Sequence, residues 1–110
     1  MLVDGISQSP GGFGFFGYSY YAGNTDKFNL VGVDAGKGCI KPSVETIRNG
    51  TYAPLSRPLF IYVKNTALAR TEVKEFLKYL LSADGRALIT EVGYVELPDD
   101  DYTAGLAKVA

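Results

Sequence analysis

Histidine and tryptophan are absent from the 110 residues, and cysteine and methionine occur once each. Without histidine the chain lacks the usual general base, the Ser-His and Cys-His nucleophile pairs, and the commonest transition-metal ligand. Cys39 alone allows no intramolecular disulfide and no cysteine cluster for a metal, so we interpret it as a small apolar or idle thiol. Because few enzyme mechanisms survive these absences, we predict that the protein is not an enzyme and has no cofactor.

The chain also lacks a dominant charge and any long apolar run. The 11 Lys and Arg residues are spread along the sequence against 12 Asp and Glu, so we expect no nucleic-acid partner, which usually requires a basic face. The longest apolar runs, around residues 13–18 and 58–63, are far shorter than the about 20 residues that span a bilayer. The first eight residues show neither the basic start nor the apolar middle of a secretory signal, which by itself favours the cytoplasm.

A glycine pattern is present at residues 12–17, where GFGFFG matches the dinucleotide fingerprint G-x-G-x-x-G. Asp34 lies 20 residues beyond Gly14, near where the fingerprint places its acidic residue. The fingerprint needs a strand before the glycines, a helix after them, and room for a pyrophosphate. A turn, SPGG, precedes them instead, and large aromatic rings fill the variable positions. We therefore predict that the glycines let an aromatic strand pack closely against a neighbour.

The remaining pattern predicts an α/β chain with three strands and about four helices. Helices are expected over residues 42–48, 71–83 and 102–109, with a helical tail over 2–8. A second short helix, over 87–92, is expected after a break at Asp84-Gly85. Strands are expected over 13–21, 29–34 and 59–63. The run LFIYV at 59–63 is apolar throughout, which is typical of a strand covered on both faces. Such a strand needs neighbours, and the chain supplies few, so we interpret it as a piece of something larger.

The helix expected from Thr71 has apolar residues at i, i+3, i+4 and i+7 spacing. Its pattern predicts that Leu77 and Leu80 are buried and that Lys74 and Lys78 face water. Near the C-terminus, three aspartates at 99–101 precede the last helix, where the helix dipole favours acidic residues. A cation site is the sharper alternative there, although three adjacent carboxylates point in different directions.

Three stretches in register carry a resemblance to a known family. They are GFGFFGYSYY at 12–21, VETIRNGTYAPLSRPLFIYV at 44–63 and EVKEFLKYLLSADGRALITEVGYVELP at 72–98. From about residue 3 to residue 109, the chain resembles the C-terminal part of the phosphate-binding proteins of bacterial ABC phosphate transporters. The resemblance implies a partial periplasmic-binding-protein fold, α/β with few strands flanked by helices and a helical C-terminal half. Residues 1–56 would be a portion of the second lobe, and residues 57–110 would return to the first.

The resemblance also implies a function, in which closure of two lobes traps phosphate without catalysis. The implied partners are inorganic phosphate, bound by the full-length parent, and the membrane permease of the transporter, and the implied location is the periplasm or cell envelope. The family's Ser-Gly-Thr loop with its nearby arginine has no counterpart in residues 1–110, so no phosphate contact carries over. We therefore expect a fragment, and the missing signal segment fits a start inside the gene. The alternative is a small standalone α/β interaction module.

Arg57 is the one candidate ligand contact. Its guanidinium lies near the implied crossing between lobes, where it could face an anion. The more ordinary interpretation is a residue at a strand edge, paired with a carboxylate. Tyr18, Tyr20 and Tyr21 are interpreted as rings that pack in the core or between lobes rather than as ligand contacts.

Overall fold

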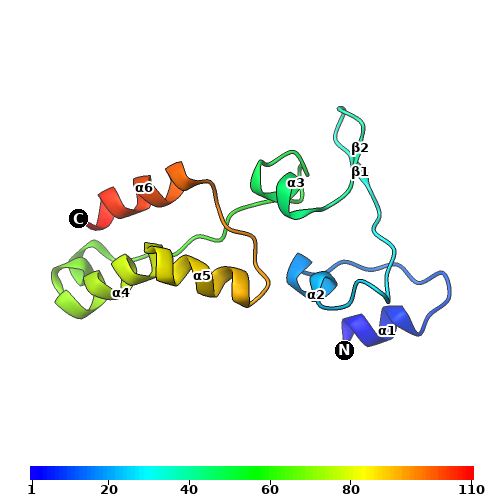
Figure 1. The fold of residues 1–110 in the computed structure, drawn as a ribbon, viewed down its shortest axis with the longest axis horizontal. Helices are drawn as coiled ribbons and strands as arrows, with labels where there is room; N and C mark the ends of the chain where they lie inside the picture. Colours follow the sequence, from blue (N-terminus) through cyan, green and yellow to red (C-terminus); the bar gives the residue numbers. More distant parts are fainter.

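The computed structural model describes residues 1–110 and shows an elongated molecule with two groups of elements (Figure 1). The first group contains helices α1 (Leu2–Ser7), α2 (Tyr18–Ala22) and α3 (Val44–Arg48) and strands β1 (Val33–Asp34) and β2 (Cys39–Ile40). The second group contains the 3₁₀-helix η1 (Asn65–Ala69) and helices α4 (Thr71–Leu81), α5 (Ala83–Glu91) and α6 (Asp99–Val109). Residues 57–63 form an extended segment that leads from α3 to the second group.

The only sheet is an antiparallel hairpin in which Val33 lies opposite Ile40 and Asp34 opposite Cys39. The carboxylate of Asp34 accepts hydrogen bonds from the backbone N–H groups of Gly36 and Gly38, at 2.7 and 3.1 Å. Both glycines have φ near +90°, at 93° and 94°, a conformation that side chains rarely allow. The strand predicted over 29–34 is therefore correct only at its end, and β2 lies outside the three predicted strands.

Helix α3 begins with a reciprocal cap. The Ser43 hydroxyl accepts the N–H of Thr46 at 3.1 Å, and the Thr46 hydroxyl accepts the N–H of Ser43 at 2.8 Å. Gly50, with φ of 75°, follows the end of the helix. The helix predicted over residues 42–48 is confirmed.

The small core lies among the C-terminal helices, where α4 packs against η1, α5 and α6. Leu77, Tyr102 and Val109 are its buried apolar side chains, with 7%, 5% and 8% of their surface exposed. Leu80, Lys74 and Lys78 are all half-buried, so the predicted contrast between the two faces of α4 holds fully only for Leu77. Helices predicted over 71–83 and 102–109 are each found within three residues of the expected bounds, whereas α5 begins at Ala83 and continues through Asp84-Gly85, where we predicted a break.

Two of the predicted strands are wrong in this structure. Residues 13–17 form no regular element, and the aromatic stretch continues as helix α2. The segment at 59–63 is extended but unpaired, and its side chains are exposed rather than covered, by 64% at Ile61 and 89% at Tyr62. A strand is stable only when other strands satisfy its backbone and other layers cover its faces, and residues 1–110 place neither beside this segment.

The molecule as a whole is loosely packed. Only 4 of 110 residues are buried, and the accessible surface of 8343 Å² exceeds the roughly 6,000 Å² typical of a folded chain of this mass. The radius of gyration is 17.2 Å, against about 13 Å for a compact domain of this length. None of the helices has the length and apolar character needed to cross a bilayer. Much apolar surface in this fold therefore lacks a covering layer.

Candidate ligand contact and ion-pair cluster

Arg57 lies at the start of the extended segment and is exposed. Its guanidinium donates one hydrogen bond, from Nη1 to the backbone carbonyl of Leu55 at 3.1 Å, and forms no ion pair. The ordinary interpretation, in which Arg57 lies at a strand edge and pairs with a carboxylate, is therefore wrong. Arg57 has no carboxylate partner and lies in no strand. The other N–H groups of the guanidinium are free to meet an anion.

The most developed polar cluster surrounds Arg86 on α5. Arg86 Nη2 lies 3.0 Å from Glu96 Oε2 and 2.6 Å from Asp99 Oδ1, and its guanidinium stacks 4.3 Å from the ring centroid of Tyr102. The Thr90 hydroxyl donates to the other oxygen of Glu96 at 2.8 Å. Hydrogen bonds from Thr90 and then Arg86 lower the pKa of Glu96, and hydrogen bonds to Asp99 and Glu96 raise the pKa of Arg86.

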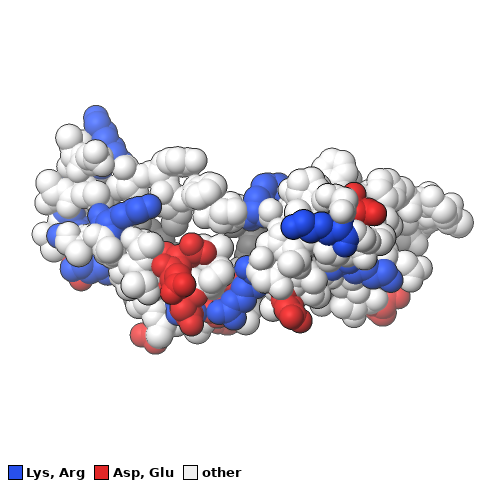
Figure 2. Space-filling view, turned by 90° about the horizontal axis from the view of Figure 1, so that it is seen from above, with Lys and Arg blue, Asp and Glu red and all other residues white.

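This Arg86 cluster joins elements rather than offering a ligand site. Its guanidinium is occupied by two carboxylates and an aromatic face, so a phosphate would have to displace them. Arg48 of α3 adds a longer contact, 3.8 Å from Nη2 to Asp99 Oδ1, which links the two groups of elements. Figure 2 shows basic and acidic side chains adjoining near the middle of one face, amid largely uncharged surface.

Sequence reasoning missed the Arg86 cluster, because its members are 10 and 13 residues apart and meet only when the chain folds back after α5. We instead interpreted the aspartates at 99–101 as acidic residues that the dipole of the last helix favours at its N-terminus. They lie in the first turn of α6, as predicted. In the structure, no three or more Asp, Glu or Cys side chains come together in a way that could hold a metal ion. The cation site is therefore not supported.

The glycine pattern has a packing role, although not within a strand. A side chain at Gly14 would overlap the Cδ1 methyl group of Ile6 on α1. The Phe16 ring meets Phe28 and Tyr20 in edge-on contacts, with ring centroids 5.4 and 6.4 Å apart. Tyr18, Tyr20 and Tyr21 lie outside the buried core, and Tyr20 is 61% exposed, so a core role for these rings is not found. No strand precedes the glycines as a dinucleotide loop would require.

A polar hollow lies between the β1–β2 hairpin and the turn after α3, and its lining includes Lys37, Asn49 and Thr51. Asn49 Oδ1 accepts the N–H of Thr51 at 2.9 Å and its hydroxyl at 2.7 Å. Asn49 and Thr51 thus bond to each other, and Lys37 is the only charged side chain that lines the hollow. Cys39 is a free, exposed thiol on the same hairpin.

No known family profile matches the chain. Similar proteins were nevertheless found by direct comparison. Protein SphX of Synechococcus elongatus is 45% identical over 109 residues, which are 98% of this chain and 32% of SphX. The phosphate-binding protein PstS of Staphylococcus epidermidis is 39% identical over 107 residues, again 32% of that protein. A crystal structure described as "a possible phosphate binding protein from Planctomyces limnophilus" matches with a TM-score of 0.76 at 43% identity, over 98% of this chain and 40% of that one.

The chain is homologous to about one third of a phosphate-binding protein. It spans about a third of the length of the PstS and SphX relatives that it matches. The structural match confirms the predicted fold class, an α/β portion of the fold of a phosphate-binding protein with a helical C-terminal half.

Proposed function

We propose that this chain is part of the phosphate-binding component of an ABC phosphate transporter, and that the complete protein binds inorganic phosphate without catalysing a reaction. The supporting observation is the 39% identity to a protein named for phosphate binding, PstS, across 96% of the chain. In this proposal the complete protein lies in the periplasm or cell envelope and delivers phosphate to the membrane permease.

Residues 1–56 would contribute to the second lobe of the complete protein, and residues 57–110 would return to the first. In support, the extended segment that starts at residue 57 leads from one group of elements to the other (Figure 1). The helices of the second group pack on one another, with α4 between α5 and α6. Each group would form its own part of a two-lobed fold.

Arg57 would supply one phosphate contact at the junction between these parts. Its exposed guanidinium has no carboxylate to compete with an anion. A small, strongly hydrated anion needs several converging donors, since one hydrogen bond to a charged group contributes only about 1.5–3 kcal/mol. The other donors would come from the two thirds of the complete protein that lie outside this alignment.

A hybrid protein tests the proposal. The 110 residues replace the matching third of S. epidermidis PstS, and equilibrium dialysis measures binding of labelled phosphate. We expect saturable one-to-one binding by the hybrid, and we expect Arg57→Ala in the hybrid to weaken it by about 10-fold or more, as loss of a charge-assisted hydrogen bond predicts.

Two comparisons give the result its meaning. Unaltered PstS shows the affinity of the parent, and Arg70→Ala in the hybrid removes an exposed arginine that is paired with Glu72 on η1–α4, away from the junction. A folded hybrid that binds no phosphate would contradict the proposed function and favour a small interaction module. Equal phosphate affinities for the hybrid and its Arg57→Ala variant would contradict only the proposed role of Arg57 and would leave the proposed function standing.

A further inference from the structure

We propose that the segment between α5 and α6, residues 92–99, is a strap that holds the two groups of elements in one relative position, through an ion pair between Arg48 and Asp99. Arg48 is then a positioning residue for phosphate binding, since it acts on the relative position of the two lobes and touches no ligand. This last step rests on the proposed function, whereas the strap itself rests on contacts within the chain.

The strap lies where the two groups meet. Figure 1 shows it in orange, between α5 and α6, on the side toward α2 and α3. One covalent connection, through residues 57–63, joins the two groups. The relative position of the groups therefore depends on noncovalent contacts, and the strap makes such contacts at two separate points along its length.

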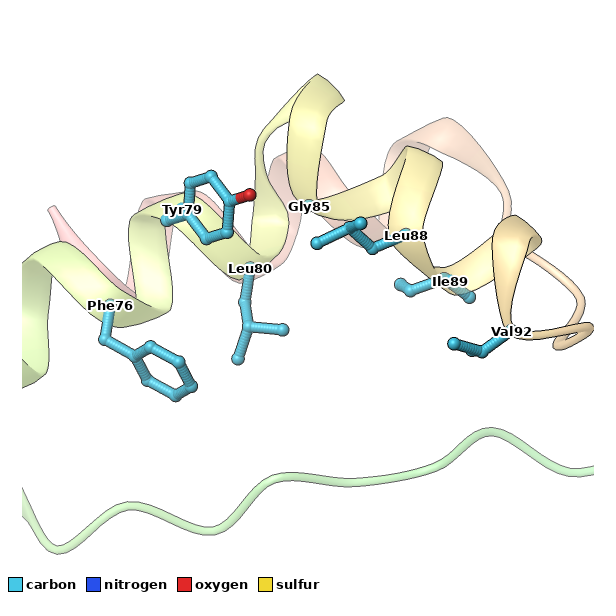
Figure 3. A pocket seen from close by; sticks show the side chains of 7 residues that line it. All are labelled: Phe76, Tyr79, Leu80, Gly85, Leu88, Ile89 and Val92. Atoms are coloured by element: carbon cyan, nitrogen blue, oxygen red, sulfur yellow. The ribbon is translucent and has the colours of Figure 1, made fainter.

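The strap starts from a fixed point of the second group. Val92 caps the end of α5, and Figure 3 shows its side chain near that of Ile89, where both line an apolar hollow of about 290 Å³ along α4 and α5. The backbone N–H groups of Gly93 and Tyr94 donate to the carbonyl groups of Thr90 and Ile89, each at 3.0 Å. The first residues of the strap are thus held on α5.

Gly93 makes the first contact of the strap with the other group. A Cβ atom added at Gly93 would lie 3.3 Å from the Cβ atom and 3.6 Å from the Cα atom of Ser19 on α2. The φ angle of Gly93 is 85°, so the backbone conformation and the close approach both suit a residue without a side chain. The backbone of the strap is therefore packed against α2.

The ion pair between Arg48 and Asp99 is the second contact. Arg48 is the last residue of α3 and Asp99 is the first residue of α6, and Arg48 Nη2 lies 3.8 Å from Asp99 Oδ1. Of the ion pairs in the structure, this one alone joins the two groups. Its side chains are 44% and 73% exposed, so the pair is weak and shifts a balance between relative positions rather than locking one of them.

The second group holds the Asp99 carboxylate in place for this pair. Arg86 Nη2 donates to the same oxygen, Oδ1, at 2.6 Å, and Arg86 is itself held by Glu96 and by the ring of Tyr102. A carboxylate that is already ordered loses less side-chain entropy when a further cation approaches it. Arg48 thus meets a carboxylate whose position the fold has already set.

Loss of the pair would weaken phosphate binding through the relative position of the lobes. Arg57, the proposed phosphate contact, lies at the start of the covalent connection between the groups, and the remaining donors must converge on the same anion. When only a fraction of the molecules holds the lobes in the binding position, the apparent affinity falls by that fraction. An exposed ion pair shifts such a balance by a small factor, about 2- to 5-fold.

Distances between the two groups test the strap in the 110-residue chain. Spin labels on the free, exposed thiol of Cys39 in β2 and on Lys108→Cys in α6 report these distances by pulsed electron paramagnetic resonance. We expect a narrow distribution in the labelled chain, a broader one after Arg48→Gln, and the narrow one again after Arg48→Lys, which keeps the charge. Sodium chloride at about 0.5 M should also broaden the distribution, since salt screens exposed ion pairs.

Lys41→Gln is the matched control, because it removes the same charge from an exposed residue of the first group that forms no ion pair. It should leave the distribution of distances unchanged, and circular dichroism should show that each variant keeps its helices. The same distribution for Arg48→Gln as for the labelled chain would overturn the strap. Equal broadening by Lys41→Gln and Arg48→Gln would overturn it as well, since net charge would then be the cause.

Phosphate binding is a separate measurement, made in the hybrid with S. epidermidis PstS. We expect Arg48→Gln to weaken the binding of labelled phosphate about 2- to 5-fold and Lys41→Gln to leave it unchanged. Equal phosphate affinities for the hybrid and its Arg48→Gln variant would contradict the positioning role of Arg48. A folded hybrid that binds no phosphate would contradict only the proposed function, because the distances in the 110-residue chain test the strap independently.

Discussion

At the scale of one residue, Gly14 shows that the residues around a glycine motif determine its role. A Cβ atom added at Gly14 would overlap Ile6 of α1, so valine there would collide with that side chain. We predict that Gly14→Val destabilises the fold by about 1–3 kcal/mol, as overpacking does, seen as a lower melting temperature. We also predict that ATP and NAD leave the melting temperature of the unaltered chain unchanged. A rise on adding either would contradict the packing role, because a ligand that binds the native state stabilises it.

Glu96 gives a prediction for pH. Its pKa is lowered below the ordinary 4.5 by hydrogen bonds from Thr90 and Arg86. A carboxylate with a lowered pKa in the folded state stabilises that state above its unfolded pKa, and the contribution disappears as pH falls through the lowered value. Glu96→Gln should therefore reduce the urea midpoint at pH 7 and have little effect near pH 2.

The control for this measurement is Glu91→Gln, which alters an exposed glutamate at the end of α5 that forms no ion pair. It should shift the midpoint little at either pH. A Glu96→Gln effect of the same size at pH 7 and pH 2 would show that the Arg86 cluster acts through packing rather than through the charge of Glu96.

At the scale of elements, α4 carries the core of the chain. Leu77 is buried on α4, the helix that packs against η1, α5 and α6, whereas Phe76 on the same helix is 60% exposed. We predict that Leu77→Ala lowers the free energy of unfolding by about 2–5 kcal/mol and that Phe76→Ala changes it much less. Urea denaturation, followed by the helical circular dichroism band at about 222 nm, measures the free energy of unfolding of each variant. A loss below about 0.5 kcal/mol for Leu77→Ala would show that the stripe is not packed.

Helices α3, α4 and α6 were predictable from the sequence because their causes are local, whereas α2 lies in a stretch that we predicted as a strand. Ser43 and Thr46 cap α3 within one turn, and the apolar spacing around Leu77 fixes the buried face of α4. The run at 59–63 has the composition of a strand, but a strand depends on distant partners that residues 1–110 do not place beside it. The same nonlocal cause hid the Arg86 cluster. It also left Arg57 without the carboxylate partner and the strand edge of its ordinary interpretation.

At the scale of the whole molecule, the loose packing and the match to one third of longer relatives have one explanation. In our proposal, the rest of a phosphate-binding protein would bury the exposed apolar side chains of residues 59–62 and the apolar hollow along α4 and α5. The same reasoning applies to the ligand. Micromolar affinity requires about 8 kcal/mol, and one exposed guanidinium beside bulk water supplies only a fraction of that.

Equilibrium dialysis of the 110-residue chain alone against labelled phosphate at low salt tests this account most directly. We predict no saturable binding at phosphate concentrations below about 10 μM, because charged contacts on an open surface are weakened by water. One-to-one binding in that range, abolished by Arg57→Ala, would contradict the account, since it would place a complete phosphate site within these residues.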